Sequence, residues 1–167
     1  GMLLPLFTGQ IKEIGDSLLP MHIPVMLCGV LCGWQYGAAV GLILPFLRSV
    51  IFSMPPIYPN AVWMSLELAT YGFVIGFIYS KIKRKNTLNL YLSLIISMIS
   101  GRIVWGITKG ILLGLNGNAF TLKMFIIGGI VDALPGIILQ LIIIPLIIKI
   151  AEQYLNKKPK SNSDYAK

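Results

Sequence analysis

Charged residues lie within apolar segments of this 167-residue chain, among them Arg48, Glu67, Arg102 and Asp132. A charge at bilayer depth costs roughly 2.5–3.5 kcal/mol on insertion scales, so such side chains usually face a bundle interior or a watery cavity. Guanidinium and carboxylate groups bind polar solutes through charge-assisted hydrogen bonds. The alternative is that Glu67 and Arg102, or Asp132 and Arg48, form ion pairs that only close the bundle.

Aromatic and polar residues accompany two of these charges at helical spacing. Residues three or four apart share a helix face, which groups Asn60, Trp63 and Tyr71 with Glu67, and Trp105 and Lys109 with Arg102. His22 lies at the predicted outer start of its segment. We therefore predict a substrate-binding pocket in the outer half of the membrane, suited to a small, polar, partly planar solute.

The composition excludes most soluble folds. The chain is 56% hydrophobic and only 12% charged, whereas soluble domains carry about 25% charged residues. We predict an all-α integral membrane protein. The net charge of +8 comes largely from clusters at segment ends, 81–85 and 157–160, which is typical of cytoplasmic flanks. No alternation of aromatic and basic residues indicates a nucleic-acid surface.

Apolar runs predict the membrane segments, with a turn at 34–37, a Pro-rich loop at 54–60 and a polar turn at 116–123. The runs are 21–33, 38–54, 61–79, 90–115 and 124–150. Basic flanks place the 81–85 turn and the C-terminus in the cytoplasm of a multi-pass plasma-membrane protein. We assign residues 1–155 to a transmembrane substrate-binding domain and 156–167 to a charged cytoplasmic tail.

Small residues recur every four positions along several segments. The glycines concerned are Gly29, Gly33, Gly37, Gly41, Gly72 and Gly76. This spacing lets helix backbones approach closely in membranes. It predicts either tight packing inside the bundle or a surface for a partner helix, and both interpretations stay open here.

Enzyme and metal motifs are not found. His22 is the one histidine, and Cys28 and Cys32, four residues apart, have no matching ligand set for zinc. The chain has no Gly-x-Ser-x-Gly elbow and no phosphate-binding loop. We expect no enzyme activity, no metal, no cofactor and no ATP hydrolysis by this chain.

Several short motifs, in this order, carry a family resemblance. They are Leu19–Val25, Gly37–Gly41, Met54–Pro56, Glu67–Gly72, Gly101–Arg102 and Leu134–Gly136. From Leu4 to about Ile150 the chain resembles the substrate-binding S components of energy-coupling-factor (ECF) vitamin transporters. The resemblance implies a six-helix bundle that captures a vitamin from outside. It also implies partners, namely a transmembrane coupling subunit and two ATPases. The family's first helix, which carries a docking motif, is expected to be largely missing here.

The solute itself is less well defined by the sequence. The pattern looks closest to S components for pantothenate or related vitamins, and an excess of cations suits a carboxylate on Arg102 or Arg48. Trp63, Tyr71 and Trp105 would equally suit a ring, as in pyridoxine, riboflavin or folate. Two other functions remain open: a membrane adaptor without a ligand, and a lipid-modifying membrane enzyme.

Overall fold

The structure, a computed structural model, describes residues 21–53, 56–82, 86–115 and 121–157. Predictions for residues 1–20, 54–55, 83–85, 116–120 and 158–167 lie outside this described part. The elements are α3 (His22–Cys32), α4 (Trp34–Phe52), η1 (Ile57–Ala61), α5 (Val62–Lys81), α6 (Thr87–Leu115), α7 (Leu122–Ile126), η2 (Ile127–Val131) and α8 (Leu134–Lys157). The described residues form helices and no strands, as predicted.

Four stretches in the described part are long and apolar enough to cross a membrane. They are Trp34–Phe52, Ile57–Lys81, Thr87–Gly114 and Leu134–Ala151. The first predicted run, 21–33, forms α3, which has only 11 residues. At 1.5 Å per residue this helix is about 16 Å long, roughly half the hydrocarbon thickness. The prediction of an all-α membrane bundle is confirmed.

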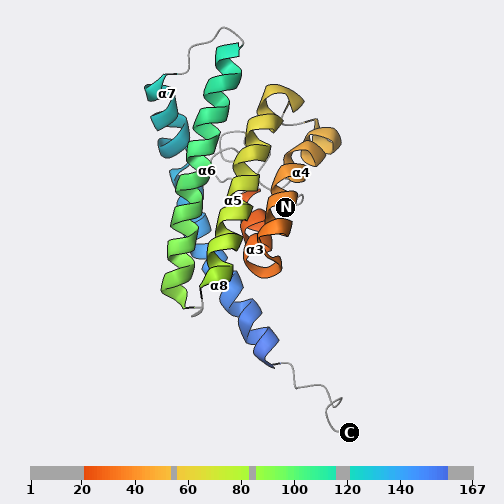
Figure 1. Ribbon diagram of the computed structural model, residues 1–167, viewed down its shortest axis with the longest axis vertical. Coiled ribbons are helices and arrows are strands. Elements are labelled where there is room, and N and C mark those ends of the chain that lie inside the picture. Colours follow the sequence, from red (N-terminus) through yellow and green to blue (C-terminus); the bar gives the residue numbers. More distant parts are fainter. Residues whose placement is uncertain (1–20, 54–55, 83–85, 116–120, 158–167) are drawn as a thin grey trace.

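Helix α5 lies between α4 and α6, and successive long helices run in opposite directions (Figure 1). It contacts α3, α4 and α6, while α8 contacts α3 and α6. The core between these helices is apolar, and Val25, Leu68, Leu94 and Ile144 are fully buried. Large apolar side chains also cover the outside, which suits a lipid environment. This arrangement brings the middles of α5 and α6 together with the start of α3.

The turn between the first two helices lies earlier than the sequence predicts. The expected turn at 34–37 is wrong, because Trp34 already begins α4 and the break is at Gly33. Gly33 has φ 105°, a conformation open to glycine and disfavoured for residues with a Cβ. The short length of α3 therefore follows from this one glycine.

Close glycine contacts hold α3, α4 and α5 together. A Cβ on Gly72 would lie 2.3 Å from the carbonyl carbon of Gly37, and a Cβ on Gly37 would lie 2.6 Å from the Cα of Gly29. Likewise, a Cβ on Gly41 would meet the backbone of α5 at 2.5 Å, and one on Gly76 the carbonyl oxygen of Gly29 at 2.6 Å. All five glycines are buried. The structure thus places them in packing within the bundle, and not on a face open to a partner helix.

The predicted last span, 124–150, is interrupted. Helix α7 passes into the π-turn η2, and a turn at Asp132–Ala133 precedes α8. The Asp132 amide donates to the Ile127 carbonyl at 2.9 Å, which is a bond over five residues. Pro135 stands in the first turn of α8, where a proline is tolerated because its missing N–H has no helical partner there.

Candidate functional site

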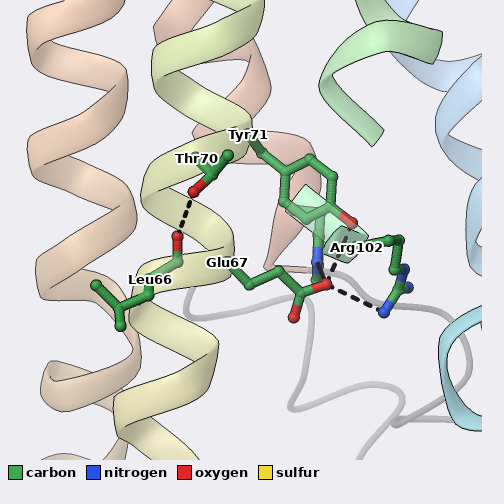
Figure 2. Close-up of polar contacts among 6 residues, drawn as sticks. Leu66, Glu67, Thr70, Tyr71 and Arg102 are labelled. Carbon is green, nitrogen blue, oxygen red and sulfur yellow. Dashed lines mark hydrogen bonds and ion pairs between the residues drawn. The ribbon is translucent and has the colours of Figure 1, made fainter. Parts of the chain in front are cut away.

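The site is built around one carboxylate oxygen, Oε1 of Glu67 on α5. Arg102 Nη1 on α6 lies 3.0 Å from it, and the Tyr71 hydroxyl donates a 3.1 Å hydrogen bond to it. His22 Nε2, at the start of α3, lies 3.6 Å away. Figure 2 shows Glu67 between the Tyr71 hydroxyl and the Arg102 guanidinium. Three helices therefore converge on one carboxylate.

The spacing of Glu67 and Tyr71 along α5 and a glycine on the neighbouring helix α6 together position this cluster. Glu67 and Tyr71 are four residues apart on α5, so they share a face. Gly101 on α6 leaves room for the Tyr71 ring, since a Cβ there would lie 2.6 Å from Tyr71 Cζ. The Tyr71 ring also meets the His22 ring edge-on, with centroids 4.8 Å apart.

His22 lies deeper than the sequence predicts. The prediction put it at the outer start of a span, whereas the half-length α3 places it against Glu67 inside the bundle. It is only 2% exposed. An 11-residue helix covers only about half the hydrocarbon thickness, so α3 begins beside Glu67 and is too short to form a full span.

Several nitrogen atoms in this cluster are buried without a hydrogen-bond partner among the described residues. They are both ring nitrogens of His22, and Nε and Nη2 of Arg102. A buried donor left unsatisfied costs about 1–3 kcal/mol. The Nε and Nη2 atoms form one edge of the guanidinium, the edge that can hold a carboxylate through two parallel hydrogen bonds. The cluster is therefore equipped to donate to an acceptor-rich group.

A second group, of aromatic rings and one lysine, continues from Arg102 along α6. Lys109 Nζ lies 4.6 Å from the centroid of the Trp105 ring and 5.5 Å from that of Trp63. Arg102 Cζ lies 5.9 Å from the Trp105 ring. Both distances for Lys109 fall within the range of cation–π attraction. Trp63 from α5 thus meets Lys109 from α6, and Arg102 and Lys109 both lie near the Trp105 ring.

Other predicted site residues lie away from the Glu67 oxygen. Arg48 donates to the sulfur of Met21 at 3.2 Å, next to the start of α3. Asn60 lies on the partly exposed η1, and Asp132 is exposed at the turn before α8. Asn60 and Asp132 are thus more exposed than the buried Glu67.

Sequence reasoning missed Phe125 and the role of Gly101. Phe125 on α7 packs against Trp105, with ring centroids 6.1 Å apart, and carries no polar signal that could have marked it. Within the described part of the chain, no three His, Cys, Asp or Glu residues are grouped so that they could hold a metal ion. The Glu67–Arg102 ion pair, predicted as the structural alternative, is present.

Comparison with known proteins gives a family. Residues 2–148 match the family described as the ECF transporter, substrate-specific component. No curated protein and no solved structure matches the chain. The match covers most of the sequence and both helices that supply the ion pair. The chain therefore belongs to the family of substrate-specific components of ECF transporters.

Proposed function

We propose that this chain captures a water-soluble, vitamin-sized anion in the outer half of the membrane, for ATP-driven uptake by partner subunits. The observation that carries the proposal is the Nε–Nη2 edge of Arg102, which is buried beside Glu67 and has no hydrogen-bond partner among the described residues. An ion pair that only closed the bundle would gain from using all of its donors. A solute carboxylate on this edge would satisfy both of them.

The charge balance favours an anion. Glu67 neutralises Arg102 across a 3.0 Å contact, and Lys109 adds a positive charge close by. The nearby acid Asp132 is exposed at the turn before α8, so among the more buried groups a solute with one carboxylate would balance that excess. Pantothenate, which has a carboxylate and no ring, is our first candidate among the vitamins.

The aromatic group supports a binding site over a purely structural cluster. Trp63 and Trp105 flank the Lys109 ammonium and offer flat apolar surface next to the ion pair. Such a combination of apolar walls and a few fixed polar groups is typical of small-molecule sites. The alternative function, a ligand-free adaptor, loses support because five of the six glycines that suggested it, all except Gly33, are buried in close contacts within the bundle.

Membership of the ECF transporter family implies a transmembrane coupling subunit and two ATPases as the partners for uptake. Lys81 ends α5 and Lys157 ends α8, and these two ends lie toward the same end of the bundle (Figure 1). By the positive-inside rule that end faces the cytoplasm. The C-terminus would then be cytoplasmic and the far ends of α5 and α6 would face outward.

Equilibrium binding to the full chain in nanodiscs tests this proposal. The panel would contain pantothenate, biotin, thiamine, riboflavin, pyridoxine and folate. We expect one carboxylate to bind, and Arg102→Gln to weaken it tenfold or more, which corresponds to about 1.4 kcal/mol. Lys149→Gln, on the exposed part of α8, is the matched control. Failure of every compound to bind the folded protein would overturn the proposal.

A further inference from the structure

A cavity of about 360 Å³ lies on the α8 side of α6. It is bounded by α6, α7, η2 and α8, and its walls include Ile95, Met98, Phe125, Ile137 and Leu141. Its volume falls within the range of ligand sites in proteins, at the small end. The cavity adjoins the site because Arg102 lines it too.

Among the described residues that line the cavity, Arg102 is the one that is charged, and the other eight are apolar. Its Nη1 atom is held by Glu67 at 3.0 Å. Its Nε and Nη2 atoms are buried and have no partner within the described part of the chain. The surface that faces the cavity is therefore almost entirely apolar, and the Nε–Nη2 edge of Arg102 lies buried at its wall.

We propose that the solute of this protein is a carboxylate with an apolar arm, whose carboxylate binds the Nε–Nη2 edge of Arg102 and whose arm lies in this cavity. The inference rests on the proposed function in that the solute is an anion, but it disfavours pantothenate, the first candidate named there. A solute with a polar arm, pantothenate included, would bury its hydroxyl and amide groups against walls that offer no partner, which is unfavourable. An apolar arm gains affinity from the same walls.

A membrane lipid is a poorer occupant than a small carboxylate. Arg102 lies about 20 Å from the end of α6 at Leu115, at 1.5 Å per residue. The headgroup of a lipid stays at the membrane surface, so a lipid could bring only its acyl chain to this depth. An acyl chain has no acceptor for Arg102, whereas a short carboxylate carries its acceptor with it.

A chain-length series tests the proposal directly. Equilibrium dialysis would measure butyrate, hexanoate and octanoate against the full chain in nanodiscs, with empty nanodiscs subtracted. Burying one methylene is worth about fourfold in affinity, so we expect affinity to rise about fourfold for each added methylene. Octanol, which partitions into lipid but lacks the carboxylate, should bind at least tenfold more weakly than octanoate.

Two substitutions on neighbouring positions of α8 localise the arm. Leu141→Trp fills the cavity, whereas Ile142→Trp adds the same bulk at a position that is 62% exposed. We expect Leu141→Trp to abolish the gain with chain length and Ile142→Trp to leave it unchanged. If Leu141→Trp fails to fold, as thermal unfolding would show, Ile137→Phe gives a smaller filling of the same wall.

The outcomes separate this inference from the proposed function. Binding of pantothenate or another polar vitamin without binding of octanoate would overturn the apolar arm and leave vitamin capture standing. Equal binding of octanol and octanoate, or an unchanged chain-length gain in Leu141→Trp, would assign the cavity to lipid and overturn the inference. Failure of all carboxylates and all vitamins would overturn both.

Discussion

The Glu67 carboxylate and the Arg102 guanidinium form a 3.0 Å ion pair between α5 and α6, and both side chains are largely buried. Desolvation of such a pair can exceed its Coulombic gain, so the pair is not in itself a source of stability. Each charge nevertheless depends on the other. Among the described residues, one edge of the Arg102 guanidinium has no hydrogen-bond partner, so a solute that binds this edge would also change the energetics of the ion pair.

Breaking the pair should destabilise the protein more than removing it. Arg102→Met leaves Glu67 buried and uncompensated, and we expect the free energy of unfolding to fall by about 3–5 kcal/mol. The double variant Glu67→Gln/Arg102→Met should recover much of that loss. Chemical denaturation in detergent measures both, with Lys149→Met as the control. Equal stability of the single and double variants would show that the two charges are not coupled.

Tyr71→Phe should have a smaller effect. It removes the 3.1 Å hydrogen bond to Glu67 and keeps the ring that packs against His22 and Gly101. We expect a loss of about 1 kcal/mol in unfolding free energy, the usual net value of a hydrogen bond, or somewhat more because the acceptor is charged. Tyr36→Phe, at a residue that is 64% exposed, should change nothing. If Tyr71→Phe left the free energy of unfolding unchanged, the Tyr71 hydroxyl would not stabilise the site.

Two glycine-to-alanine substitutions should have different effects on the stability of the fold. Gly72→Ala places a methyl group 2.3 Å from the backbone of Gly37, which forces α4 and α5 apart. We expect destabilisation at or above the 1–3 kcal/mol typical of overpacking. A Cβ on Gly114 meets nothing within 4 Å, so Gly114→Ala should be neutral or stabilising by up to about 1 kcal/mol through helix propensity. Thermal unfolding of the two variants side by side provides the check.

Lys109 should contribute to affinity through its charge. Lys109→Met removes the ammonium that lies over Trp63 and Trp105, and we expect anionic solutes to bind about tenfold more weakly, or about 1.4 kcal/mol. Lys109→Arg keeps the charge and the cation–π contact and should retain most of the affinity. The measurement is equilibrium binding of a carboxylate that binds the parent chain, compared between the two variants. If both variants bind like the parent chain, Lys109 has no part in recognition.

The bounds of a helix could be predicted where its apolar run is uninterrupted and is flanked by turn or polar residues. The runs 61–79 and 90–115 became α5 (Val62–Lys81) and α6 (Thr87–Leu115). Prediction failed where backbone conformation, not hydrophobicity, ends a helix. Gly33 ends α3 through a positive φ, and the π-turn before Asp132 divides the last run. Neither feature changes the apolar pattern.

The residues of the site also differ in whether the sequence pattern alone could reveal them. Glu67 and Arg102 could be found because a charge in an apolar segment is unfavourable without a partner. The depth of His22 could not, since it depends on where α3 ends. The cavity beside Arg102 left no trace in the pattern, because its other lining residues are apolar like the rest of the span. That space depends on how α6, α7, η2 and α8 pack together, and not on the types of the residues that line it.

The contact among Gly29, Gly37 and Gly72 has a consequence for the comparison of related sequences. At these positions natural selection would act on the distance between backbones, so invariance among relatives would report helix spacing and not contact with a solute. Specificity would instead be recorded at cavity positions such as Ile137 and Leu141, where side chains can vary in size without separating the helices. Relatives that carry different solutes should therefore diverge on one side of α6 and stay constant on the other.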